Sequence, residues 1–333
     1  MGRRVLTLAA LVLLLPSRGF AQGDTPARIK SRTELVVVPV TVKDAKGNLV
    51  SDVRRDEFRI FEDGAEQQIA LFSAEVFPLS AVVLIDNDLP LKTADQVQRS
   101  LLAIAAGFSS TDEVALMKYA DFPEPVIDFT LDNDKIFTQL KRMRLGSNFP
   151  GQGSAAMTAG PKINEQSVKP GVPNVGGTKQ PVVTTSLTDA VHAAGELLRD
   201  RGRDRRKIIF LISDGANGKN RMTYEDTIQL LLSGDISVYS IVVGSSLPVL
   251  KRGSGLLDKY ATATGGDYFY ASKQRDLERL YSKVAEEART QYTLAYVPHN
   301  PKGKNDYHSI EVKIRRPNLN LLARQGYYTT APH

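Results

Sequence analysis

The sequence predicts an α/β fold with a doubly wound, mainly parallel, Rossmann-like sheet and flanking β segments that form a small accessory β domain. Two observations carry this prediction. Between residues 78 and 288, short apolar strands alternate with amphipathic helices, as they do in βαβ units. Strand patterns without helices precede this region, at 33–77, and follow it, at 289–329.

The first 21 residues predict a secretory signal peptide. Arg3 and Arg4 precede an apolar stretch at 5–15, and small residues at 19–21 favour cleavage after Ala21. The stretch is about half as long as a membrane-spanning helix, so we expect no transmembrane segment in the mature chain. We expect export to the periplasm, the cell surface or the medium, with residues 22–32 as a polar linker.

Composition narrows the class of protein. The chain has 333 residues, 42% of them hydrophobic, so it can bury a sizeable core, and it has no cysteine to form disulfides. Loss of Arg3, Arg4 and Arg18 with the signal peptide lowers the formal charge from +6 to +3. This small excess predicts no nucleic-acid partner.

The N-terminal β module spans residues 33–77. Val36, Val38, Val40 and Val42 share one parity, as a half-buried strand requires. The remaining expected elements are a hairpin turn at 44–48, a strand at 58–61, a turn at 62–64 and a strand at 68–72.

The α/β domain spans residues 78–288 and contains one long insertion. Residues 146–183 are rich in Gly, Pro, Ser, Thr and Asn without apolar periodicity, which predicts an inserted flexible loop. We expect strands at 81–85, 114–119, 208–212 and 238–243, and helices at 94–108, 134–143, 187–199, 224–232 and 277–288.

The C-terminal segment 289–329 returns to β character. Strand patterns at 292–297 and 308–314 flank a turn at 298–303, and another follows at 323–328. The opening module of roughly 45 residues is too small to be stable alone, so we expect the two β segments to pair.

Three loops carry oxygen-bearing side chains where predicted strands end or helices begin. Asp86 and Asp88 follow the first buried strand, Thr185 precedes a helix, and Asp214 follows another strand. Ligands bind at the carboxyl ends of strands in open α/β sheets, and calcium or magnesium prefers such hard oxygen ligands. Asp86, Asp88, Thr185 and Asp214 are therefore the candidate metal ligands.

These loops resemble the metal-ion-dependent adhesion site of the von Willebrand factor A (vWA) family, which combines an Asp-x-Ser-x-Ser loop with a distant Thr and a distant Asp. Asp86, Thr185 and Asp214 match by position, and Thr178 competes with Thr185 for the second loop. The chain also resembles the exported VWFA-related (Acidobacterial-type) family through its turn at 58–64, Thr264-Gly265-Gly266, and the segments 291–296 and 324–328. The resemblance implies a vWA fold and a non-catalytic role in protein–protein interaction or adhesion.

The chain departs from the family at the first loop, where Asp88 and Pro90 replace the two serines. The site is therefore a degenerate version of the family's site. Three carboxylates around one divalent ion would leave it net negative and poorly suited to an acidic partner group. Calcium tolerates this change better than magnesium, and the alternative is that Asp86 and Asp214 only cap loops, with no ion.

Asp86-x-Asp88 also resembles the first motif of haloacid-dehalogenase-like, magnesium-dependent phosphohydrolases. There the first Asp attacks phosphorus and the second acts as general acid and base. Pro90 and the lack of an acidic partner beside Asp214 count against this alternative. The four histidines make no metal-ligand spacing, and no nucleophile motif of the Gly-x-Ser-x-Gly kind occurs. Because no set of catalytic base and nucleophile accompanies the three loops, we expect no enzyme and no catalytic residues.

Overall fold

The computed structural model describes residues 35–146, 162–163, 166–167, 185–244, 255–298 and 306–329. The expected signal peptide (1–21), the linker (22–32), Thr178 and nearly all of the expected loop 146–183 lie outside the described residues. The described residues all belong to one compact unit. Within them, no helix is both long enough and apolar enough to cross a membrane.

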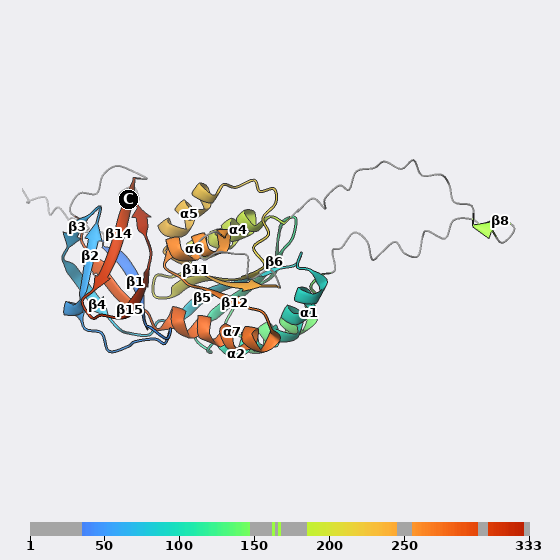
Figure 1. The fold of residues 1–333 in the computed structure, drawn as a ribbon, viewed down its shortest axis with the longest axis horizontal. Coiled ribbons are helices and arrows are strands. Elements are labelled where there is room, and N and C mark those ends of the chain that lie inside the picture. The colour runs from blue at the N-terminus through green and yellow to red at the C-terminus, as the bar shows by residue number, and fades with distance from the viewer. Residues whose placement is uncertain are drawn as a thin grey trace, which may run out of the picture. The chain divides into compact units, whose positions relative to one another are not determined.

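A six-stranded sheet in the order β12-β11-β10-β5-β6-β7 forms the centre of the α/β region (Figure 1). Neighbouring strands run parallel, except that β7 runs antiparallel to β6. Its strands are β5 (Leu79–Asp86), β6 (Glu113–Tyr119), β7 (Pro123–Thr130), β10 (Arg206–Ser213), β11 (Ile236–Val243) and β12 (Tyr268–Ala271). The predicted α/β fold class is confirmed.

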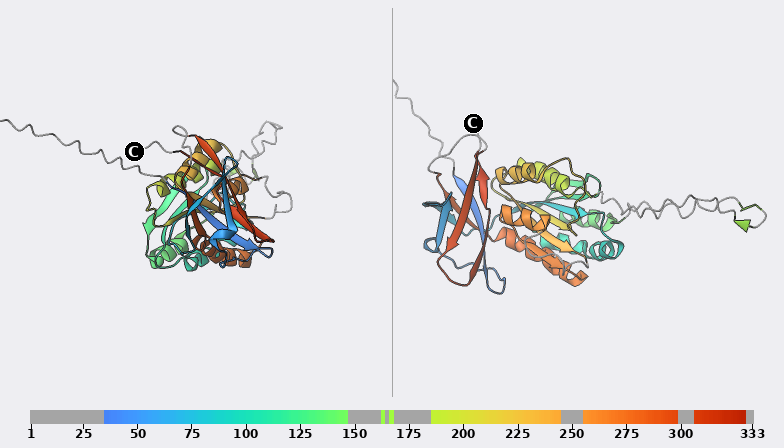
Figure 2. Two further views of the ribbon diagram at one scale, coloured as in Figure 1. Left: turned by 90° about the vertical axis from the view of Figure 1, so that its left-hand side faces the viewer. Right: turned by 45° about the horizontal axis from the view of Figure 1, so that its top comes forward.

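Helices cover both faces of this sheet (Figures 1 and 2). Every residue of β5, β10 and β11 is buried, as expected of parallel strands covered on both sides. Along β5, Ala81, Val83 and Ile85 pack into one core, and Val82 and Leu84 into the other. The first core contains α1 (Leu91–Ser100), α2 (Leu102–Gly107), α3 (Asn133–Arg142) and α7 (Gln274–Arg289), and the second contains α4 (Leu187–Arg199), α5 (Tyr224–Ser233) and α6 (Leu256–Thr264).

The flanking β segments form two four-stranded antiparallel sheets, β15-β1-β13-β4 and β16-β14-β2-β3. Each sheet thus contains strands from both ends of the described chain. Val36, Val38, Val40 and Val42 lie in the core of this region, as their shared parity predicts. The strands are β1 (Val36–Asp44), β2 (Phe58–Glu62), β3 (Ala65–Gln67), β4 (Ile69–Ser73), β13 (Tyr292–Tyr296), β14 (Tyr307–Ile314), β15 (Leu319–Ala323) and β16 (Gly326–Tyr328), with the short helix η1 (Arg55–Glu57) before β2.

Several elements differ from the sequence-based expectation. The strands on either side of the expected turn 298–303, β13 and β14, belong to different sheets. The expected helix 94–108 is divided at Leu101 into α1 and α2. Helix α6 and strand β7 were not expected, and within the expected loop β8 (Lys162–Ile163) pairs with β9 (Gln166–Ser167). Pro123 and Pro125 make β7 look unlike a strand in the sequence. The strand tolerates both prolines because it lies at the sheet edge.

Buried polar contacts connect the β sheets to the α/β region. The Arg206 guanidinium on β10 donates to the carbonyl oxygen of Gln291, just before β13, over 2.6 Å. The Lys43 ammonium on β1 lies 2.7 Å from the Glu287 carboxylate on α7. These contacts connect β1 to α7, and the residue before β13 to β10, the strand that leads to Asp214.

Candidate functional site

The candidate site lies where the chain direction across the central sheet reverses. From β5 the chain continues to β6 on one side, whereas β10, on the other side of β5, continues to β11. Ile85 and Ile212 are paired, so Asp86 and Ser213, the last residues of their strands, end side by side. Such a topological switch point is where open α/β sheets bind ligands.

Asp86 is held rigidly at the centre of this edge. It is 1% exposed. Its Oδ1 accepts the backbone N–H of Asp88 at 2.9 Å, and its Oδ2 accepts the hydroxyls of Ser213 at 2.8 Å and Tyr119 at 3.3 Å. Both carboxylate oxygens therefore already have donors.

Burial raises the pKa of Asp86 to about 7, and the negative charge of Asp214 adds to this effect. The hydrogen bonds from Asp88 and Ser213 oppose it, because they favour the ionised carboxylate. A positive ion at this edge would favour the ionised form further.

Asp88 and Thr185 come together across 97 residues of sequence. The Thr185 hydroxyl donates to Asp88 Oδ2 over 2.8 Å. Thr185 is fixed because its carbonyl oxygen accepts the N–H of Gly218 at 2.6 Å and the next residue, Ser186, donates its N–H to Ala120 at 2.8 Å. Ser186 is also the N-cap of α4, so Thr185 lies directly before the N-terminus of this helix.

Asp214 lies in a tight turn after β10. Its Oδ1 accepts the N–H of Ala216 at 2.9 Å, and Gly215 makes this turn with φ of 83°. Burial raises the pKa of Asp214, and the charge of Asp88 raises it further. A Cβ placed on Gly244 would lie 3.9 Å from Asp214 Cβ and 3.7 Å from Thr93 Oγ1, so Thr93 also borders the site.

The structure therefore brings Asp86, Asp88, Thr185 and Asp214 to one edge. Sequence reasoning missed Ser213, Tyr119 and Thr93. The position of Ser213 and Tyr119 as the last residues of β10 and β6 could have revealed them. Thr93 carried no such signal, since it lies inside the first turn of α1.

The donor set of this edge, carboxylates and hydroxyls, fits a hard divalent cation. Among the residues that the structure describes, three carboxylate or imidazole groups converge to within 4.8 Å of one another only at Glu62, Asp63 and His308. The acidic residues of the loop edge are more widely spaced than that. A cation there would contact some of these groups directly and others through water, as magnesium and calcium commonly do.

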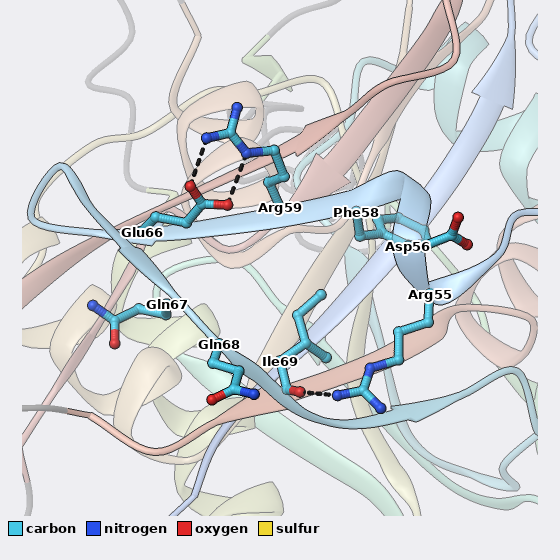
Figure 3. Close-up of a pocket in the computed structure, with 8 residues that line it drawn as sticks. All are labelled: Arg55, Asp56, Phe58, Arg59, Glu66, Gln67, Gln68 and Ile69. Atoms are coloured by element: carbon cyan, nitrogen blue, oxygen red, sulfur yellow. Dashed lines mark hydrogen bonds and ion pairs between the residues drawn. The ribbon is translucent and has the colours of Figure 1, made fainter.

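A surface hollow lies elsewhere, beside the β2–β3 hairpin, with a volume of about 360 Å³ (Figure 3). Its two arginines are already engaged, since Arg59 makes a bidentate contact with Glu66 and Arg55 donates to the carbonyl oxygen of Ile69. None of the predicted site residues borders it. Its lining consists of Arg55, Asp56, Phe58, Arg59, Glu66, Gln67, Gln68 and Ile69.

No protein-family model and no curated protein matches the chain. Among solved structures, it is similar to a von Willebrand factor type A protein from Catenulispora acidiphila, with 10% identity and a TM-score of 0.45 over 90% of this chain and 75% of that one. BatB from Bacteroides thetaiotaomicron shows 13% identity and a TM-score of 0.43 over 63% of this chain and 98% of that one. Proximal thread matrix protein 1 of the mussel byssus, with a zinc-occupied MIDAS motif, shows 12% identity and 0.43 over 69% and 50%.

Proposed function

We propose that the chain is an exported vWA-type protein that binds a protein partner through the loops at the carboxyl edge of its central sheet and catalyses no reaction. One observation carries the proposal. Asp86, Asp88, Thr185 and Asp214, from three separate loops, meet at the switch point between β5 and β10. This is the arrangement that the resemblance to the adhesion site of the vWA family implies.

We further propose that calcium or magnesium binds at this edge. Asp88, Thr185 and Asp214 would hold the ion, with Asp86 behind them as the buried acceptor that orients the loop. A bound cation supplies positive charge to an edge whose carboxylates otherwise repel one another. Three carboxylates carry three negative charges and one divalent ion carries two positive charges, so the edge would stay net negative. It would therefore favour partner groups that are neutral or basic.

The burial of Asp86 supports a non-catalytic role. A nucleophilic carboxylate must reach the substrate, but Asp86 is 1% exposed and both of its oxygens accept hydrogen bonds. A generic phosphate ester with magnesium tests the phosphohydrolase alternative. Turnover that disappears in Asp86→Asn would overturn the non-catalytic part of the proposal.

Calorimetric titration of the full chain with calcium and with magnesium tests the cation. We expect binding that weakens by about tenfold or more in Asp88→Asn and in Thr185→Val, because each loses an oxygen ligand or its support. Asp95→Asn is the matched control, since Asp95 forms an exposed pair with Arg99 on α1. A flat titration of the unaltered chain, with an unchanged melting temperature, would refute cation binding.

Capture from a native envelope fraction tests the partner. We expect a protein that is retained with calcium or magnesium, lost with a chelator, and lost in Asp88→Asn but not in Asp95→Asn. If neither the chelator nor Asp88→Asn reduces the capture of the partner, the binding surface must lie elsewhere. N-terminal sequencing of the protein made in its native host tests for cleavage after Ala21, and an intact leader would contradict the proposed export.

A further inference from the structure

A second polar cluster lies where the β2–β3 turn meets β14, and it is separate from the loop edge. Glu62 is the last residue of β2, and Asp63 follows it in the turn with φ of 48°. His308 is the second residue of β14, which pairs with β2 so that Ile310 faces Glu62. One donor atom from each of Glu62, Asp63 and His308 lies within 4.8 Å of the others.

His308 is buried with only one of its two ring nitrogens engaged. Nδ1 lies 2.7 Å from Asp63 Oδ2, and the ring stacks on Tyr327 with centroids 5.2 Å apart. The residue is 3% exposed, and its Nε2 is buried with no hydrogen-bond partner in the described structure. Buried ring nitrogens are normally satisfied by a donor, an acceptor, water or an ion, so the surroundings of His308 leave one ring nitrogen unsatisfied.

The two carboxylates are held in place beside this ring. Asp63 Oδ1 accepts the N–H of Ser309 at 2.9 Å and its hydroxyl at 3.1 Å. Glu62 is 7% exposed, and its Oε2 accepts the Tyr327 hydroxyl at 3.2 Å. Hydrogen bonds of this kind orient metal ligands, and the half-exposed side chain of Asp63 leaves a route for an ion from solvent.

We infer that Glu62, Asp63 and His308 form a binding site for a divalent transition-metal ion of the zinc class. Two carboxylates and one neutral imidazole balance the two positive charges of the ion. An imidazole nitrogen favours zinc and other first-row transition metals over calcium and magnesium. Calcium and magnesium prefer all-oxygen sites such as the loop edge.

A metal ion here would fasten the β2–β3 turn to a strand 245 residues away along the chain. The chain has no cysteine, so no disulfide can make such a connection. Metal sites whose ligands come together only on folding stabilise the folded state. The expected role is therefore structural, and it does not depend on the proposed function of the loop edge.

Zinc titration of the chelator-treated full chain, followed by calorimetry and thermal unfolding, tests the site. We expect one equivalent of zinc to bind and to raise the melting temperature. Asp63→Asn keeps an acceptor for His308 but removes a charge, so it should fold and weaken zinc binding by about tenfold or more. His308→Asn should weaken it by about 100-fold or more.

Two controls separate this site from others. His192→Gln removes a histidine on α4 outside the cluster, and Asp88→Asn alters the loop edge, so neither should change zinc binding. Nitrogen-15 spectra of the histidine rings should show zinc shifting His308 rather than His192, which gives a readout even if His308→Asn does not fold. The inference is overturned if zinc does not bind, if it binds equally to Asp63→Asn, or if Asp88→Asn abolishes binding.

Discussion

Replacing Lys43 with methionine is expected to destabilise the fold by about 3–4 kcal/mol at pH 8. The Lys43 ammonium lies 2.7 Å from Glu287 Oε1 and 2.5 Å from Asp267 Oδ2. The side chains of Lys43 and Glu287 are 9% and 1% exposed, respectively. Methionine fills a similar volume but leaves both carboxylates without their shared cation, and breaking a buried ion pair in this way typically costs about 3–5 kcal/mol.

The ability of Glu287 to take up a proton limits this cost. Burial raises the pKa of Glu287 even though the charge of Lys43 opposes the shift. When Lys43 is lost, the only cation left beside the carboxyl in the described structure is Lys283, whose Nζ lies 3.7 Å from Glu287 Oε1. The carboxyl can then become neutral instead of remaining charged with this weaker partner. Protonating an ordinary glutamate, with a pKa of about 4.3, costs about 5 kcal/mol at pH 8, because one pKa unit corresponds to about 1.36 kcal/mol. The loss should therefore not greatly exceed that value.

Urea unfolding of Lys43→Met at pH 5 and at pH 8 checks both the size and the pH dependence. A carboxyl whose pKa is higher in the folded than in the unfolded state favours folding at low pH and loses this contribution as pH rises. The variant should therefore be less destabilised at pH 5 than at pH 8. Lys313→Met is the matched control, because Lys313 pairs with Glu311 on the surface, where such pairs contribute about 1 kcal/mol or less. A loss at Lys43 no larger than at Lys313 would refute this reasoning.

Two further predictions concern a close backbone contact and a buried carboxylate, and urea unfolding checks both. Gly266→Ala should cost more than about 2 kcal/mol, because the new Cβ would lie 2.0 Å from the Val238 carbonyl oxygen. Gly47→Ala meets no atom within 4 Å and pays only for its positive φ, about 1 kcal/mol, so equal losses would contradict the steric argument. At Asp112, burial acts to raise the pKa, but hydrogen bonds from Arg289 and two backbone N–H groups outweigh it and hold the pKa below its usual value. The stabilisation by the ionised Asp112 carboxylate is present at neutral pH and is lost as pH falls through that lowered pKa. Asp112→Asn should therefore cost about 2 kcal/mol at pH 7 and less at pH 3. A loss that does not depend on pH would contradict this prediction.

The buried strands of the central sheet could be predicted because burial on both faces of a strand requires apolar residues at successive positions. Residues 81–85 and 208–212 are continuous apolar runs, since both faces of their strands are covered by helices. The assignment of β13 and β14 to different sheets could not be predicted, because the turn residues at 298–303 indicate only that the chain reverses. Strand β7 was hidden by Pro123 and Pro125, which are typical of loops unless the strand lies at an edge.

The two polar clusters differ in how far local sequence can reveal them. Asp86 is the last residue of β5 and Asp214 directly follows β10. Because the ends of neighbouring parallel strands meet at one edge, their positions in the sequence are enough to predict that they lie together. His308 meets Glu62 and Asp63 only because β14 pairs with β2 in the register that sets Ile310 against Glu62. A shift of one residue would turn the His308 side chain to the opposite face of the sheet and away from both carboxylates. A site of this kind depends on a pairing between distant strands, which neither residue spacing nor composition encodes.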